Sequence, residues 1–174
     1  MKPKAVIVFM FLLLTGGVYS KADLIIDGHL DIYNGDVYNT EVGVIGNGSL
    51  DMFGGYVHHL GISNFATANI YGGSIDWLWT FDYSVVNIHG GNIGIWESSG
   101  EPDGELYLYA YDVSILPAPE GQDYGTINGL YYQDNAPFSI NYSRVDDLSN
   151  LHIVPEPATF LLLGSGLLLL RKIR

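Results

Sequence analysis

The sequence predicts an all-β protein: a single-domain parallel β-solenoid, or β-helix, of about five coils. One eight-residue pattern recurs: an apolar residue, Asp or Asn, an apolar residue, an aromatic residue or His, two turn residues, any residue and a β-branched residue. Its copies occupy residues 30–37, 50–57, 68–75, 86–93 and, without the glycines, 106–113. The copies begin 18 or 20 residues apart. This period is too short for paired helices and fits one solenoid coil, whose strands stack on those of the next coil.

An N-terminal signal helix is predicted at residues 1–22, as a substrate of signal peptidase. Two lysines precede an apolar run over residues 5–14, which is too short for an ordinary membrane span. Small residues follow, so cleavage after Ser20 and cleavage after Ala22 both stay open. The alternative is a retained N-terminal anchor.

Aligning the copies places residues of one kind above one another in the stack. Successive strand residues point to opposite faces, so alternate apolar residues are expected to face the core. The expected inward columns are Leu30, Leu50, Ala68, Val86 and Leu106; Ile32, Met52, Ile70, Ile88 and Leu108; and Val37, Val57, Ile75, Ile93 and Val113. The residues between them are expected to face outward.

The turn residues of the pattern predict a corner in every coil. Two adjacent glycines permit positive φ and a sharp change of direction, and Asn34 before Gly35 serves equally because Asn tolerates the left-handed region. The predicted turn glycines are Gly35, Gly54, Gly55, Gly72, Gly73, Gly90 and Gly91. Second strands are expected after the corners, at residues 41–45, 57–62, 75–81 and 93–96.

The repeats are expected over residues 23–116, interrupted by an acidic loop at residues 97–105. Residues 117–150 are expected to form a loop and a capping β-hairpin, which covers the open edge of the last coil. The hairpin strands are expected at residues 126–132 and 138–145. Residues 146–153 are expected to be a linker.

The C-terminal segment, residues 151–174, has three parts. They are the tetrapeptide Val154-Pro155-Glu156-Pro157, an apolar run from Ala158 to Leu170, and a basic stop made of Arg171, Lys172 and Arg174. This order resembles the PEP-CTERM sorting signal of exopolysaccharide-producing Gram-negative bacteria. The resemblance implies processing by a membrane exosortase near the Pro-Glu-Pro motif, followed by release or attachment at the cell surface. A tail anchor that is never cleaved is the alternative.

The physical properties of this segment agree with the resemblance. The thirteen residues from Ala158 to Leu170 make a hydrophobic helix of only about 20 Å, which is shorter than the ~30 Å hydrocarbon core of a membrane. The basic stop is expected to stay in the cytoplasm. We therefore expect an exported protein, extracellular or at the cell surface, that is transiently anchored in the membrane by this helix.

The charge of the body excludes some partners. Between residues 23 and 150 the sequence has 18 Asp and Glu residues and a single basic residue, Arg144, which leaves a formal charge of −17. A body of this charge is repelled by nucleic acids and by anionic lipid surfaces. The absence of cysteine excludes disulfides and thiolate metal sites.

The outward Asp/Asn column is a candidate site. It consists of Asp31, Asp51, Asn69 and Asn87. Either these are solvated strand residues with an Asn ladder, or a Ca²⁺ ion bridges Asp31 and Asp51. Two carboxylates do not supply the six to eight oxygens that Ca²⁺ prefers. His58 and His59 are expected on opposite faces of a strand, so they predict no zinc site.

The outward aromatic column is the second candidate site. It consists of Tyr33, Phe53, Tyr71, His89 and Tyr109. These rings either contact glycans or stack on one another. Trp77, Trp79 and Trp96 are either partly buried or form a sugar-binding platform.

These observations predict no catalytic residue, no cofactor and no enzymatic activity. We expect a structural or adhesive protein of an exopolysaccharide layer or biofilm. The alternatives are a carbohydrate-binding module that uses the outward aromatic residues, a polysaccharide-active enzyme and an ice-binding protein. The enzyme is disfavoured because short coils with a single Arg offer little groove for a substrate, and ice binding is disfavoured because Thr is scarce in the columns.

Overall fold

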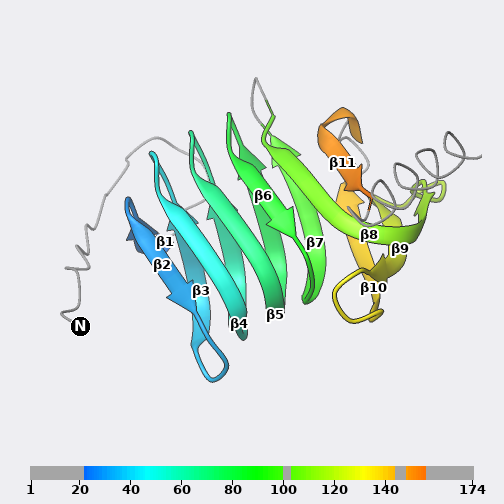
Figure 1. Ribbon diagram of the computed structural model, residues 1–174. Coiled ribbons are helices and arrows are strands. Elements are labelled where there is room, and N and C mark those ends of the chain that lie inside the picture. Colours follow the sequence, from blue (N-terminus) through cyan, green and yellow to red (C-terminus); the bar gives the residue numbers. More distant parts are fainter. Residues whose placement is uncertain (1–21, 100–102, 144–147, 156–174) are drawn as a thin grey trace, which may run out of the picture.

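The computed structural model describes residues 22–99, 103–143 and 148–155. Within these ranges almost all of the regular secondary structure is β-strand. The strands form two stacked layers that run from β1 and β2 at one end to the last strands at the other (Figure 1). No helix in the described ranges is long and apolar enough to cross a membrane. The predicted C-terminal hydrophobic helix and residues 1–21 of the predicted signal helix lie outside the described residues, and Ala22 is the first residue of a strand.

Eleven strands form one continuous sheet that winds into the coil. They are β1 (Ala22–Ile26), β2 (His29–Ile32), β3 (Val37–Val44), β4 (Ser49–Ile62), β5 (Thr67–Phe81), β6 (Val85–Ile88), β7 (Asn92–Ser99), β8 (Glu105–Leu116), β9 (Tyr124–Tyr131), β10 (Pro137–Ser143) and β11 (Leu151–Val154). A short 3-10 helix, η1 (Leu148–Asn150), precedes β11.

The coil has two faces, and every pairing within the repeats is parallel. The first face contains β2, the first halves of β4 and β5, β6 and the first half of β8. The second face contains β1, β3, the second halves of β4 and β5, and β7. β4 and β5 each run through a glycine corner, so the two strands expected in each of these coils form one bent strand. The stacked-coil architecture of about five turns is therefore confirmed.

The corner glycines have two different roles. Gly35, Gly55, Gly73 and Gly91 have positive φ angles. The preceding glycines allow close approach of neighbouring coils, since a Cβ on Gly90 would lie 2.7 Å from the carbonyl oxygen of Tyr71. The second glycine of each pair thus turns the chain, and both glycines lack a side chain where neighbouring coils approach closely.

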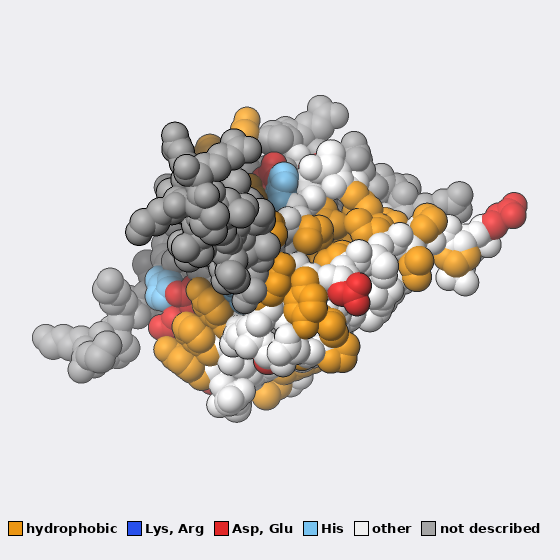
Figure 2. Space-filling view, turned by 45° about the vertical axis from the view of Figure 1, so that its right-hand side comes forward, with side chains coloured by type: hydrophobic (Ala, Val, Ile, Leu, Met, Phe, Trp, Pro, Cys, Tyr) orange, Lys and Arg blue, Asp and Glu red, His pale blue; other side chains and the backbone are white. Residues whose placement is uncertain are grey.

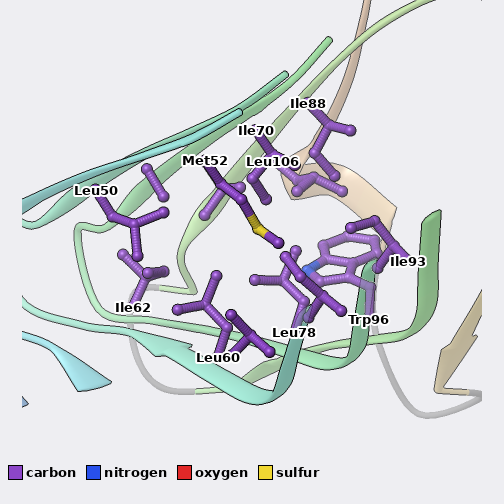
Figure 3. Close-up of a cluster of buried hydrophobic side chains, with 14 of the residues drawn as sticks. Leu50, Met52, Leu60, Ile62, Ile70, Leu78, Ile88, Ile93, Trp96 and Leu106 are labelled. Carbon is purple, nitrogen blue, oxygen red and sulfur yellow. The ribbon is translucent and has the colours of Figure 1, made fainter. Parts of the chain in front are cut away.

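The core lies between the two faces and is filled by the predicted columns (Figure 3). The fully buried members of these columns include Leu50, Met52, Ile70, Ile88 and Leu106 from the first face and Ile93 from the second. Leu60, Leu78 and Trp96 of the second face, which the predicted columns did not include, are fully buried beside them. Each fully buried side chain of this size contributes about 1.5–3 kcal/mol of transfer free energy. Stacking similar coils therefore builds most of the core from one repeated pattern.

Two predicted members of the third column, Val37 and Val113, are not fully buried in the core. Val37 is 59 % exposed, and Tyr38 pairs with Val57 in its place. The first corner is longer because Asp36 closes a turn, accepting a 2.8 Å hydrogen bond from the Tyr33 amide and donating its own amide to the Tyr33 carbonyl. Val113 is only partly buried because β8 has left the parallel stack at that point.

A hairpin closes the C-terminal end of the stack. β9 pairs antiparallel with both β8 and β10, and β10 pairs parallel with β7. The hairpin therefore connects the first face to the second across the end of the core. Ile127, Tyr131 and Ile140 from these strands are buried there, so the core does not end on an open edge.

The predicted linker at residues 146–153 is wrong for residues 148–153, and residues 146–147 lie outside the described part of the chain. Residues 148–150 form η1, and residues 151–154 form β11, which pairs parallel with β8 beside Leu106 and Tyr109. This strand extends the first face by one more coil position. The sequence around it lacks the repeated pattern, so its own residues did not indicate the pairing.

Candidate functional site

The C-terminal sorting segment starts directly at the folded coil. Val154, the first residue of the predicted motif, is the last residue of β11, and Pro155 follows it at the end of the described range. Residues 156–174, including the hydrophobic segment and the basic stop, lie outside the described residues. The geometry that leads to the motif is therefore set by β11 and its neighbours.

A buried asparagine anchors the chain just before β11. Asn150 donates hydrogen bonds of 2.7 Å to Ser98 Oγ and 2.6 Å to the carbonyl oxygen of Gly104. Leu148 and Leu151 on either side pack against the core. Sequence reasoning missed Asn150, because the partners lie more than 45 residues away and carry no pattern.

β11 is also held on its outer surface. His152 Nε2 is paired with a Glu105 carboxylate oxygen, and the His152 ring stacks on Tyr107 with the centroids 4.6 Å apart. Glu105 and Tyr107 both lie on β8, so both contacts secure the same strand pair. The sorting segment consequently leaves from a firmly packed edge.

The outward Asp/Asn column forms a ladder, as one of its two interpretations required. Asp31 pairs with Asp51, Asp51 with Asn69, and Asn69 with Asn87 in adjacent strands. The Asn69 amide donates a 2.7 Å hydrogen bond to Asp51 Oδ1, and the Asn87 amide donates a 2.9 Å bond to Asn69 Oδ1. Each amide thus links its own coil to the preceding one.

At the beginning of this column, His29 lies close to the carboxylates of Asp31 and Asp51. His29 Nε2 lies 3.0 Å from Asp31 Oδ1 and 3.9 Å from Asp51 Oδ2. His29 Nδ1 lies 2.8 Å from Ser49 Oγ on the neighbouring strand. His29, Asp31 and Asp51 are the one group of potential metal ligands found within the described part of the chain. Sequence reasoning missed His29, although its position two residues before Asp31 places both side chains on one side of β2.

The aromatic column forms a continuous stack. Ring centroids are 5.4 Å apart between Tyr33 and Phe53, 5.2 Å between Phe53 and Tyr71, 4.9 Å between Tyr71 and His89, and 3.9 Å between His89 and Tyr109. The interplanar angles are 7–22°. A ring inside the stack has neighbours on both faces, so only its edge is free for a ligand. Burial within this stack lowers the pKa of His89.

The second face carries a different aromatic cluster, made of His58, His59, Trp77 and Trp79. Contrary to the prediction, His58 and His59 do not point to opposite faces, and their rings stack with the centroids 3.9 Å apart. The reason is that two outward residues separate the buried Val57 and Leu60, which breaks the strict alternation. Trp77 and Trp79 are half-buried and meet edge to face at 5.8 Å.

Carboxylates border this cluster. Asp76 accepts hydrogen bonds from the Tyr56 hydroxyl at 2.5 Å and from His58 Nδ1 at 2.9 Å. These bonds lower the pKa of Asp76. Glu97 accepts a 2.9 Å hydrogen bond from Trp79 Nε1. His58 with Asp76 and Trp79 with Glu97 are 18 residues apart, so the repeat period itself signals both pairs.

Trp96 does not belong to this cluster. It is fully buried in the core, and its Nε1 donates a 3.2 Å hydrogen bond to Thr80 Oγ1. Of the two interpretations of the tryptophans, burial therefore holds for Trp96, while Trp77 and Trp79 remain available on the outside.

The family model of the PEP-CTERM protein-sorting motif matches residues 154–174. The chain carries this motif at its C-terminal end. The PEP-CTERM motif implies a protein that is exported, processed by an exosortase and sorted to the cell surface. No curated protein and no solved structure matches the chain.

Proposed function

We propose that the protein is a non-enzymatic structural or adhesive component of an extracellular polysaccharide layer. The observation that supports this most is that β11 ends at Val154, the residue at which the PEP-CTERM motif begins. Cleavage at the Pro-Glu-Pro motif then releases the coil without removing any of its strands. The β-solenoid is then the mature product, and the segment after it is the sorting signal.

The outer surface supports a structural role. Its columns are occupied by contacts between coils, namely the amide ladder that begins at Asp51 and the ring stack that begins at Tyr33. The described residues include no Lys or Arg, and the coloured side chains of the face seen in Figure 2 include Asp, Glu and His beside many hydrophobic ones. The contacts between coils stiffen this surface, which suits a structural component of a polysaccharide matrix.

The sorting proposal is tested by intact-mass analysis of the protein recovered from the surface of its host. The expected mass lacks residues 1–20 or 1–22 and the residues that follow the Pro-Glu-Pro motif. An intact C-terminus on surface-exposed protein would contradict exosortase processing and would favour the uncleaved tail anchor.

A matched pair of variants separates sorting from folding. Replacing Pro155 and Pro157 with Ala is expected to leave the full-length chain in the membrane fraction, because the cleavage motif is lost. Pro119→Ala, in the loop before β9, is the control and is expected to be processed normally. Equal processing of the two variants would show that the exosortase does not recognise the Pro-Glu-Pro motif.

The second candidate function is carbohydrate binding through the cluster of Trp77, Trp79 and His59. Two half-buried indoles bordered by the Glu97 carboxylate combine an apolar surface with hydrogen-bond acceptors, which is the chemistry that sugar rings require. A glycan array tests it, followed by Trp77→Ala and by Phe65→Ala as a control at an exposed aromatic residue elsewhere. Binding that Trp77→Ala abolishes supports this function, and no binding at millimolar sugar removes it.

The absence of enzymatic activity is tested on polysaccharides extracted from the host. We expect no release of reducing ends or unsaturated products on incubation with the purified protein. Release that persists in a homogeneous preparation would replace the structural role with that of a polysaccharide-active enzyme.

A further inference from the structure

We propose that His29, Asp31 and Asp51 bind a divalent transition-metal ion, with Zn²⁺ as the reference ion. The three side chains project from β2 and β4 at the start of the outward polar column. His29 Nε2 lies 3.0 Å from Asp31 Oδ1 and 3.9 Å from Asp51 Oδ2. All three potential ligand atoms lie within 4.8 Å of one another.

The imidazole decides the class of ion. Two carboxylates alone resemble an incomplete Ca²⁺ site, because Ca²⁺ takes six to eight oxygens. One imidazole and two carboxylates are instead a ligand set for Zn²⁺, with bond lengths of about 2.0–2.2 Å. Ligand atoms around a tetrahedral ion of that size lie roughly 3.3–3.5 Å apart. The observed separations bracket this value, so small rotations of side chains complete the site and leave a fourth position for water.

Neighbouring groups orient two of the three ligands. Ser49 Oγ lies 2.8 Å from His29 Nδ1, which allows Nδ1–H to donate to Ser49 and turns the Nε2 lone pair toward the carboxylates. The Asn69 amide holds Asp51 Oδ1 at 2.7 Å, which leaves Asp51 Oδ2 as the oxygen that faces His29. Outer partners of this kind fix the tautomer and the direction of metal ligands.

The charge balance of the column also favours a cation. Asp31 and Asp51 are paired in register on adjacent parallel strands, so their carboxylates stack and repel. The described residues contain no Lys or Arg that could neutralise them. In the metal-free protein the tautomer with Nε2–H donates to Asp31 Oδ1, while Nδ1 accepts from the Ser49 hydroxyl. Metal binding uses the other tautomer, in which Nδ1–H donates to Ser49 and Nε2 is free to bind the ion. A divalent ion then occupies the position of the Nε2 hydrogen and compensates the charge of both carboxylates.

The test uses the full-length chain, purified with a chelator and then dialysed against Zn²⁺. We expect the protein to bind one equivalent of Zn²⁺ at this site, and we expect the bound ion to raise the Tm. His29→Gln and Asp31→Asn are each expected to weaken binding more than about tenfold, because losing even an outer partner costs 10–100-fold. Glu120→Gln, in the exposed loop before β9, is the control and is expected to bind like the parent.

Asp51→Asn separates loss of the metal site from loss of the fold. Asn keeps the oxygen that accepts from Asn69 and removes the carboxylate stack, so the metal-free variant is expected to have an equal or higher Tm while losing the Tm increase with Zn²⁺. The proposal is overturned if Zn²⁺ binds the His29 and Asp31 variants as it binds the parent, if no Zn²⁺ binds, or if Ca²⁺ displaces Zn²⁺ at comparable concentration.

Discussion

At the scale of single residues, the outside of the coil is held together by side chains that repeat every 18 residues. The amide of Asn69 is the centre of this arrangement, because it donates to Asp51 and its oxygen accepts from Asn87. Both bonds lie between strands that are already paired through their backbones. They therefore favour the observed register of those strands over a shifted one. A single side chain therefore links three coils.

Asn69→Ala is expected to lower the free energy of unfolding by about 1–3 kcal/mol, because it leaves two partly buried partners without their hydrogen bonds. Urea unfolding measures the change. The control is Asn39→Ala at an exposed strand position, which is expected to change stability by less than about 0.5 kcal/mol. Equal effects of the two variants would show that the ladder contributes nothing to stability.

His89 makes stability depend on pH. Its pKa is lowered from 6.5 by burial in the aromatic stack, so the unfolded chain binds the proton more tightly than the folded chain. Stability is therefore full above pH 6.5 and falls as the pH drops through the lowered pKa of the folded state. His59, whose pKa is also lowered, acts in the same direction.

Replacing His89 with Tyr keeps the ring stack and removes the titrating group. We expect the parent to lose more stability than His89→Tyr between pH 7.5 and pH 5, as measured by thermal unfolding at each pH. Parallel pH profiles for the two proteins would rule out a contribution from His89.

At the scale of the element, the glycine corners determine how each coil passes from one face to the other. Gly73 has a φ of +93°, and a Cβ on it would lie 2.7 Å from the carbonyl oxygen of Gly54 in the preceding coil. The corner therefore requires both a left-handed backbone and the absence of a side chain. This double demand explains why glycine recurs at the second position of each corner.

Gly73→Ala is expected to destabilise the protein by at least about 1–3 kcal/mol, because it adds backbone strain and displaces the neighbouring coil. Gly28→Ala is the matched control, since a Cβ there would meet nothing within 4 Å. Denaturant unfolding of both variants measures the difference. A Gly73→Ala variant as stable as Gly28→Ala would show that the corner can rearrange.

At the scale of the whole molecule, the β9–β10 hairpin closes the stack at its C-terminal end. It joins β8 on the first face to β7 on the second, and the buried side chain of Ile140 lies on β10, its second strand. An uncovered end would expose strand edges and core residues, which promotes association between chains.

Ile140→Asp is expected to detach the hairpin from the core and to cause self-association, detected by light scattering after size-exclusion chromatography. Ser139→Asp adds the same charge at the adjacent exposed position of β10 and is expected to remain in the state of the parent. Identical elution of the two variants would show that the cap is not needed to keep the end of the stack closed.

The residues that departed from prediction show why the sequence alone was insufficient. Val37 matches the repeated pattern, yet a local turn at Asp36 shifted the register by one residue and exposed it. His58 and His59 lie on the same side because the strand does not alternate strictly there. Such shifts depend on hydrogen bonds to other parts of the chain, and a period-two pattern does not contain them.

By itself, the sequence determined the stacked coils, the buried columns, the glycine corners and the C-terminal PEP-CTERM motif. These features are encoded locally, because a fixed period and alternating apolar residues leave one way to bury the core. Only the tertiary structure decided that β11 joins the sheet, that Trp96 is buried while Trp77 and Trp79 are not, and that His29 meets Asp31 and Asp51. These outcomes depend on which segments distant in sequence pack together, and this is determined by the packing of the whole folded stack.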